Sequence, residues 1–374
     1  MLLAVAVLEV ALHPFATGLR NDWQRVPVAV DPDTGQATEV RQYHEGISVS
    51  HFSPAHARLT GATWVPGAPV GVVLGDSYIE AKQIGDSETI GAVVERAARQ
   101  SGAPLNVRQY GWSGASVPQY LAVAPYILKR WNPRWVAITL NEGDLRSLAG
   151  VSPDTTAPFK VPAPTQTFGT DAFASAAARA QASPLRSLPQ AVTSRSAVAY
   201  ELLLRSLEIV GTGTGDADGG GAAPLPVVGV QFGARHVVRA LHRAYGSRVA
   251  VLYVATLRPG EDAPDTLGAA LLSACTAEGI ACASTHDGMH RELERHSRFA
   301  RGFLNGPPAS GHPNAVGHRV MGETLWSVVG AATNNGGRIA DVSQTNASTT
   351  QAGSPDGDEE TPAAQRAPVA RRTP

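Results

Sequence analysis

The chain has 374 residues, which is enough for one large domain or two and for a sizeable buried core. Its formal net charge is −1 and 17% of its residues are charged, so the composition does not favour nucleic acid as a partner. The sequence therefore predicts no nucleic-acid partner.

The N-terminal residues are apolar but match neither an export signal nor a membrane span. Residues 1–12 include Glu9, and no Lys or Arg precedes them. A secretory signal has a basic start, and a membrane span needs about 20 apolar residues. We interpret residues 1–19 as the remnant of a signal or anchor, with a buried helix at a cytoplasmic start as the alternative. The expected location is extracytoplasmic, and this segment is the only predicted point of membrane association.

Residues 20–69 are predicted to form an irregular, partly β N-terminal segment that contains Tyr43-His44-Glu45-Gly46. From residue 70, short apolar runs alternate with helical periodicity up to about residue 330. This alternation predicts a doubly wound α/β domain with a parallel sheet. The expected strands cover residues 70–74, 105–110, 135–140, 248–254 and 280–284, and the expected helices cover 90–100, 117–131, 232–245 and 266–278.

Two segments interrupt or follow this pattern. Residues 151–230 are predicted to be an insertion, because they begin rich in Pro, Ala, Ser and Thr and include a glycine-rich loop at 211–221. Residues 331–374 are polar and rich in proline toward their end, which predicts a disordered tail.

The only two cysteines, Cys275 and Cys282, flank the end of a predicted helix and the start of the next strand. Such a placement permits a disulfide in an oxidising compartment. Two small buried thiols are the alternative.

A Gly-Asp-Ser turn at residues 75–77 follows the first strand of the domain directly. A serine at the carboxyl end of a parallel strand lies where open α/β sheets bind their ligands, close to main-chain N–H groups. A second Gly-Asp-Ser at 85–87 follows a mixed polar run and has no strand before it. Ser77 is therefore the candidate nucleophile.

Three further loops are expected at the same edge of the sheet. They contain Gly111 to Ser116 after the second strand, Asn141 to Leu145 after the third, and Ser310 to His318 after the last. Together they would bring a serine, glycine N–H groups, an amide and a histidine close to one another. These are the parts that serine hydrolysis requires.

In this order, the four stretches resemble the sequence blocks of the SGNH hydrolases, also called GDSL-type esterases and lipases. The resemblance covers roughly residues 70–145 and 301–326. It implies a three-layer α/β/α sandwich with a parallel sheet, the flavodoxin-like arrangement of that family. It also implies an ester hydrolase that uses an acyl-enzyme and needs no metal or organic cofactor.

The resemblance assigns roles residue by residue. Ser77 matches the nucleophile, and its own N–H and that of Gly114 match two donors of the oxyanion hole. The family usually has Gly-x-Asn-Asp in its third block, but here Gly143 occupies the position of the asparagine. Either Asn141 supplies the amide from a shifted position or that donor is missing.

His312 matches the general base, but the aspartate that commonly stands three residues before it is replaced by Ala309. Either a main-chain carbonyl orients the imidazole or an acid comes from elsewhere, with Asp287 as one candidate. His318 is expected to pack or cap a helix. A metal site at His286 and His290 lacks a convincing third ligand.

The expected function is hydrolysis of carboxylic esters, short-chain or carbohydrate O-acyl, with a small molecule or a carbohydrate as the substrate. One alternative is an O-acyltransferase or deacetylase acting on cell-surface polysaccharide. The other is a non-catalytic binding domain with the same fold, which the replacement at Ala309 and the altered third block would favour.

Overall fold

The computed structural model describes residues 24–27, 36–42, 45–46, 48–53, 55–146, 227–257, 266–303 and 309–335. The predicted N-terminal signal or anchor lies outside these residues, as do nearly all of the predicted insertion and most of the predicted tail. The last helix, α13, continues to Asn335 and so extends into the segment predicted as tail.

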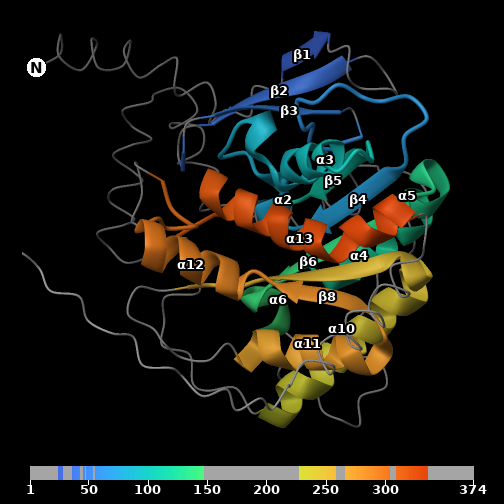
Figure 1. Ribbon diagram of the computed structural model, residues 1–374, viewed down its shortest axis with the longest axis vertical. Coiled ribbons are helices and arrows are strands. Elements are labelled where there is room, and N and C mark those ends of the chain that lie inside the picture. The colour runs from blue at the N-terminus through green and yellow to red at the C-terminus, as the bar shows by residue number, and fades with distance from the viewer. Residues whose placement is uncertain are drawn as a thin grey trace, which may run out of the picture.

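A five-stranded parallel sheet forms the centre of the molecule, as predicted (Figure 1). In chain order, the first three strands are β4, β5 and β6 and the last two are β7 and β8, but in the sheet the order is β5-β4-β6-β7-β8. This is the flavodoxin-like strand order, in which the first crossover runs one way and the later ones run the other. The strands span Val70–Gly75, Asn106–Gly111, Trp135–Asn141, Val249–Val254 and Ala281–Ser284.

Helices cover both faces of this sheet, which confirms the three-layer arrangement. Alternate residues of one strand enter separate cores: Val251 of β7 packs in one and Leu252 in the other. Helices α4, α5, α10 and α11 contribute to the first core, and α3 and α13 to the second. They span Val117–Ala122, Ala124–Trp131, Val227–Tyr245, Thr266–Glu278, Ile90–Gln100 and Ala315–Asn335.

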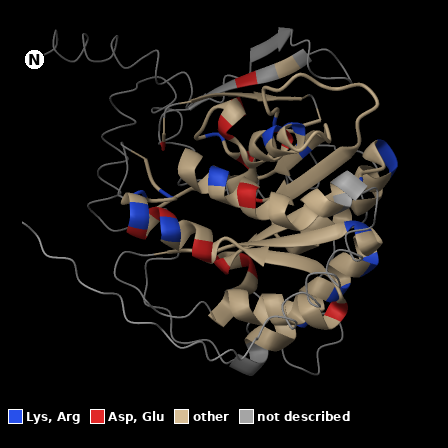
Figure 2. Cartoon of the chain, viewed as in Figure 1, with Lys and Arg blue, Asp and Glu red and all other residues tan. Residues whose placement is uncertain are grey.

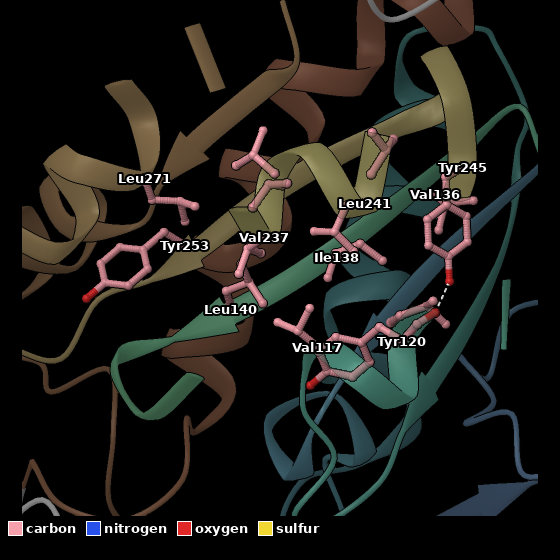
Figure 3. Packing of buried hydrophobic residues seen from close by; sticks show 14 of the residues in the cluster. Val117, Tyr120, Val136, Ile138, Leu140, Val237, Leu241, Tyr245, Tyr253 and Leu271 are labelled. Carbon is pink, nitrogen blue, oxygen red and sulfur yellow. Dashed lines mark hydrogen bonds between the residues drawn. The ribbon is translucent and has the colours of Figure 1, made fainter. Parts of the chain in front are cut away.

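The first core shows why the strands are continuous apolar runs in the sequence. Val136, Ile138 and Leu140 of β6 point toward α4 and α10, where Val237 and Leu241 meet them (Figure 3). The Tyr245 hydroxyl donates to the main-chain carbonyl of Tyr120 and so satisfies its polar end inside this core. A strand buried on both faces needs apolar residues at successive positions.

The helix predicted over residues 117–131 is in fact two helices that meet at Val123. Pro125, in the first turn of α5, has no N–H to continue the helical hydrogen bonding from α4. The remaining short elements are α2 (Ser77–Glu80), η2 (Asp86–Glu88), α6 (Glu142–Arg146), η4 (Gly246–Arg248) and α12 (His286–His296).

The N-terminal segment contains an antiparallel sheet of three strands, β1 (Gln24–Pro27), β2 (Gln36–Gln42) and β3 (Ser48–Phe52). Arg58 connects this sheet to the central one, because it forms isolated β-bridges with Phe52 of β3 and Gln109 of β5. The N-terminal segment therefore docks at the β5 edge of the parallel sheet.

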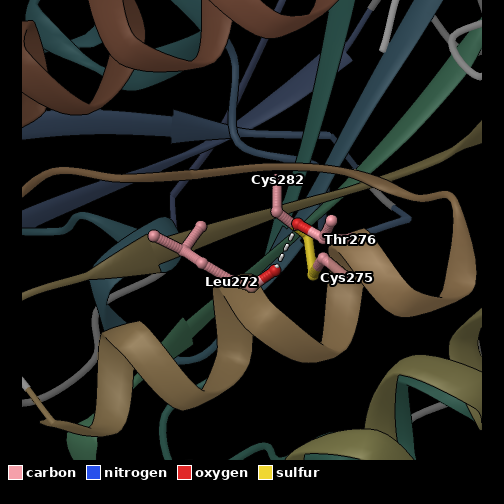
Figure 4. The surroundings of a disulfide bond; sticks show 4 residues. All are labelled: Leu272, Cys275, Thr276 and Cys282. Carbon is pink, nitrogen blue, oxygen red and sulfur yellow. Dashed lines mark hydrogen bonds between the residues drawn. A yellow bond between two sulfur atoms is a disulfide. The ribbon is translucent and has the colours of Figure 1, made fainter. Parts of the chain in front are cut away.

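Cys275 and Cys282 form a disulfide between α11 and β8 (Figure 4). Their Cα atoms are 6.1 Å apart, within the usual range for a disulfide. The structure thus favours a disulfide over two free buried thiols.

Lys and Arg residues are interspersed with Asp and Glu over the helices in the view of Figure 2, and α12 carries both signs. Among the described residues, no helix combines the length and the apolar character needed to cross a membrane.

Candidate active site

The turn that carries Ser77 is built at the end of β4. Asp76 caps α2, because its carboxylate accepts a hydrogen bond of 2.9 Å from the Tyr78 N–H. Ser77 is the first residue of that helix and is partly exposed. At the start of a helix the main-chain N–H groups have no helical acceptor and point outward. Ser77 therefore presents both a hydroxyl and a main-chain donor.

The second Gly-Asp-Ser, at 85–87, has a different environment. Asp86 accepts hydrogen bonds from the main-chain N–H of His51 at 3.0 Å and from Arg58, and it contacts the His51 imidazole at 2.6 Å. It is thus engaged in a contact with the N-terminal segment. The two Gly-Asp-Ser turns differ in their surroundings because only the first one follows a strand, β4.

Gly111 and Gly114 serve different purposes at the end of β5. A Cβ atom on Gly111 would lie 1.9 Å from the Glu80 nitrogen, so glycine is needed for the close approach of α2. Gly114 has φ +77°, and a Cβ there would meet nothing within 4 Å. The loop between them is tied to α2, because the Ser113 hydroxyl donates to the Glu80 carboxylate at 2.5 Å.

In the third loop, Asn141 faces the turn that carries Ser77. Its amide nitrogen donates to the Asp76 carboxylate at 2.7 Å, and its amide oxygen accepts from the Asp144 N–H at 3.2 Å. The Asn141 N–H in turn donates to the Asp144 carboxylate at 3.1 Å. The structure therefore brings the Asn141 amide to the turn, with one of its two N–H bonds directed at Asp76.

Asp76 and Asp144 form an acidic pair on the two sides of Asn141. Burial raises the pKa of Asp76 to about 6, while His312, Asn141 and Arg301 each favour its charged form. Burial also raises the pKa of Asp144 well above its ordinary value, and the nearby Asp76 adds to that rise. At neutral pH the pair thus carries less negative charge than two exposed carboxylates would.

His312 lies beside the turn that carries Ser77. Its imidazole meets the ring of Tyr78, the residue after Ser77, edge to face with 5.7 Å between the ring centroids. Glu45 holds His312 at two atoms: one carboxylate oxygen is 2.5 Å from the imidazole Nδ1, and the other accepts the His312 main-chain N–H at 2.5 Å. A carboxylate on Nδ1 leaves the far ring nitrogen to face a nucleophile.

The acid beside His312 is therefore Glu45, and the expectation of Asp287 in that position is corrected. The Asp287 side chain is 87% exposed, and its carboxylate lies 3.2 Å from the His286 Nδ1. Asp287 belongs to α12, whose first turn points it into solvent, whereas the connection between β2 and β3 carries Glu45 to the histidine loop.

Sequence reasoning missed Glu45 because the residue lies 267 positions before His312 and no local motif marks it. The only available indication was an acid followed by glycine in the predicted N-terminal segment. Gly46 has φ +78°, and a Cβ on it would lie 2.6 Å from the Gln83 carbonyl oxygen. The turn can thus pack closely against the segment that follows α2.

Arg301 fixes the other side of the histidine loop. Its Nε donates to the Gly311 carbonyl at 2.7 Å, so the peptide between Gly311 and His312 is held by Arg301 at its oxygen and by Glu45 at its N–H. One Nη donates to Thr256 at 2.8 Å, and the other donates to the Tyr78 hydroxyl. Arg301 therefore links the loop that carries His312 to α2, the helix that begins at Ser77.

Three other histidines considered from the sequence have different surroundings. His318 is 1% exposed, and burial lowers its pKa to about 3, so it packs as a neutral side chain. The rings of His286 and His290 stack on α12 with centroids 6.0 Å apart. Within the described part of the chain, no three His, Cys, Asp or Glu residues are grouped so as to hold a metal ion.

Comparison with known proteins gives fold-level similarities to hydrolases. No family model and no curated protein matches the chain. Solved esterase structures do match it. TesA is 15% identical with a TM-score of 0.37, and the match covers 70% of this chain and 97% of that one. LAE5, an alpha/beta hydrolase from the metagenome of Lake Arreo, is 14% identical with a TM-score of 0.39, and the match covers 72% and 97%.

A family 3 carbohydrate esterase from Clostridium thermocellum is 10% identical with a TM-score of 0.37, and the match covers 71% of this chain and 98% of that one. At these values, any assignment of chemistry has to rest on the side chains of this protein.

Proposed function

We propose that the protein is a serine esterase that cleaves carboxylic esters through an acyl-enzyme on Ser77. The observation that carries this proposal is the double contact of Glu45 with His312 beside the nucleophile turn. A carboxylate that fixes both the backbone and the ring of a histidine is the arrangement expected for the base of a serine hydrolase. It also supplies the acid whose absence at Ala309 would have favoured a non-catalytic domain.

In the first half of the reaction, the Ser77 Oγ attacks the acyl carbon and its proton passes to the far ring nitrogen of His312. The Glu45 carboxylate stabilises the imidazolium that forms. His312 then gives the proton to the leaving alkoxide oxygen, and the alcohol departs from the acyl-enzyme. In the second half, water attacks the acyl carbon, its proton passes through His312 to Ser77, and the free acid leaves.

The main-chain N–H groups of Ser77 and Gly114 are the proposed donors to the oxyanion, and the second N–H of the Asn141 amide is the third. The left-handed conformation of Gly114 turns its peptide in a direction that other residues rarely adopt. Each such donor typically lowers the barrier by about 3 kcal/mol. Since Gly143 offers no side chain, Asn141 is the only amide of this loop that can serve.

The proposed substrates are esters of short acids, including O-acyl groups on carbohydrates. A sugar hydroxyl that replaced water in the second half would make the protein an acyltransferase. Product analysis with p-nitrophenyl acetate and an oligosaccharide separates the two: hydrolysis yields only acetate, whereas transfer yields acetylated sugar.

Substitution of the nucleophile tests the proposal. Ser77→Ala is expected to lower p-nitrophenyl acetate hydrolysis by at least about 1,000-fold, because the covalent route is removed. The chain offers a matched control in Ser87→Ala, which alters the same tripeptide at the second site and should leave the rate unchanged. Retention of wild-type activity by Ser77→Ala would refute the proposed mechanism.

A further inference from the structure

The turn that carries Glu45 belongs to a hairpin, formed by β2 and β3, that packs against a short segment of the central domain. The hydroxyls of Ser48 and Ser50 both donate to the Lys82 carbonyl, the latter at 3.2 Å. Gly46 approaches the Gln83 carbonyl closely enough that a Cβ would lie only 2.6 Å from it. The hairpin is thus seated on residues 82–86, which follow α2 directly.

Asp86 provides the charged contact between residues 82–86 and the hairpin. One of its carboxylate oxygens accepts the His51 N–H at 3.0 Å and a hydrogen bond from Arg58, and the other lies 2.6 Å from the His51 Nδ1. Arg58 is fully buried and donates to the Ile84 carbonyl at 2.8 Å. The other nitrogen of His51 lies 3.6 Å from the Glu39 carboxylate on β2. Both strands of the hairpin are therefore connected to Asp86 through His51.

Residues 82–86, against which the hairpin packs, follow closely after the helix that carries Ser77. Residues 77–80 form α2, Ala81 ends it in a left-handed conformation, and the Asp86 turn begins five residues later. The nucleophile and the support for Glu45 are consequently parts of one segment of chain. A displacement of the hairpin on this segment would move Glu45 relative to His312 without moving Ser77.

From this arrangement we propose that Asp86 is a positioning residue for catalysis: it docks the β2–β3 hairpin through His51 and so holds Glu45 against His312. The inference rests on the proposed function, because it assumes that Glu45 supports the base. It assigns a role to the second Gly-Asp-Ser sequence, whose aspartate binds the segment that completes the site.

Asp86→Asn tests the proposal, with Glu88→Gln as the matched control. Glu88 lies in the same 3-10 helix, and its carboxylate accepts a hydrogen bond of 2.9 Å from the Gly85 N–H. Asp86→Asn is expected to lower kcat for p-nitrophenyl acetate roughly 10- to 100-fold with KM nearly unchanged, since small misplacements of catalytic groups cost about this much. Glu88→Gln should retain the wild-type kcat.

Combination with Glu45→Gln separates positioning from a purely structural role. If Asp86 acts through Glu45, then adding Asp86→Asn to Glu45→Gln should lower kcat less than about twofold further, because coupled residues are not additive. Losses that multiply fully, or a wild-type kcat in Asp86→Asn alone, would overturn the proposal. His51→Gln breaks the same contact from the hairpin side, and it decides the question by the same criteria if Asp86→Asn does not fold.

A proton NMR measurement gives a readout that does not need activity. The Nδ1 proton of His312, held by a carboxylate, is expected to give a low-field resonance, identified by its loss in Glu45→Gln. That resonance should also be lost or broadened in Asp86→Asn and persist in Glu88→Gln; persistence in Asp86→Asn would contradict the docking role. If Ser77→Ala proved active, the proposed function would fail, while this spectrum would still report whether Asp86 positions Glu45.

Discussion

Glu45 and His312 are joined at two atoms across 267 positions of sequence, one contact to the imidazole and one to the main chain. This relationship makes the N-terminal segment part of the proposed site. The central α/β domain supplies the serine, the glycine loop, the amide and the histidine, but the acid comes from outside it. The β2–β3 hairpin thus supplies the carboxylate that supports the His312 imidazole.

The first prediction concerns that acid. Glu45→Gln is expected to lower kcat for p-nitrophenyl acetate at pH 7.5 by roughly 100-fold or more, because the imidazolium loses its counter-charge. Asp287→Asn removes the acid that the sequence offered as one candidate and should leave kcat unchanged. Equal kcat values for Glu45→Gln and Asp287→Asn would argue against a catalytic role for Glu45.

The same substitution should change the pH profile. A carboxylate beside Nδ1 stabilises the charged imidazole, so its removal is expected to lower the pKa of the catalytic base. The acid limb of kcat/KM should therefore move to lower pH in Glu45→Gln. An acid limb at the wild-type position would show that another group controls the base.

Asp76 should make stability depend on pH. An unfolded aspartate has a pKa of about 3.9, whereas burial raises the pKa of Asp76 to about 6 in the folded protein. Between these values the folded state binds more protons than the unfolded state, so this stabilisation is complete below about pH 4 and is lost as the pH rises through 6. Asp76→Asn removes the titrating group.

Urea unfolding at pH 4.5 and pH 7.5 measures this effect. From the lower to the higher pH, the free energy of unfolding of the wild type should fall relative to that of Asp76→Asn. The comparison cancels the titration of carboxyls that do not interact with Asp76. Asp144 is the exception, because Asp76 contributes to its raised pKa and Asp76→Asn removes that contribution. A difference between the two proteins that is the same at both pH values would exclude the raised pKa.

Features of the fold and the proposed site could be predicted from the sequence where neighbouring residues determine them. Apolar runs such as residues 135–140 are recognisable because a strand covered on both faces must be apolar throughout. Ser77 could be singled out as a candidate because a strand ends just before it. The break at Val123 was missed because apolar periodicity continues across it while Pro125 interrupts the hydrogen bonding. Glu45 could not be placed, because its contact depends on how a separate hairpin docks.

The two glycines of the second loop should respond differently to alanine. Gly111→Ala would put a Cβ 1.9 Å from the Glu80 nitrogen, a main-chain atom that can move only with α2. A loss of about 1–3 kcal/mol in the free energy of unfolding is expected from such overpacking. Gly114→Ala meets no neighbouring atom and is strained only by its φ of +77°, so it should cost less. Urea unfolding of both variants checks the order, and a larger loss for Gly114→Ala would contradict it.

The disulfide should contribute to stability and not to catalysis. Cys275 and Cys282 are seven positions apart, and closing a loop of this size typically stabilises a protein by about 2–3 kcal/mol. Dithiothreitol is expected to lower the urea midpoint of the wild type and to have no effect on Cys275→Ala/Cys282→Ala, with kcat equal in both proteins. If complete reduction left the urea midpoint of the wild type unchanged, the disulfide would make no such contribution to stability.

The most direct measurement for the whole account is covalent labelling of the folded protein with a fluorophosphonate, followed by peptide mass spectrometry. The account predicts one phosphonyl adduct on the peptide that contains Ser77, slower labelling in Glu45→Gln, and none in Ser77→Ala. Failure of the folded wild type to react, or an adduct on a different serine, would contradict the claim that Ser77 is a nucleophile activated by His312.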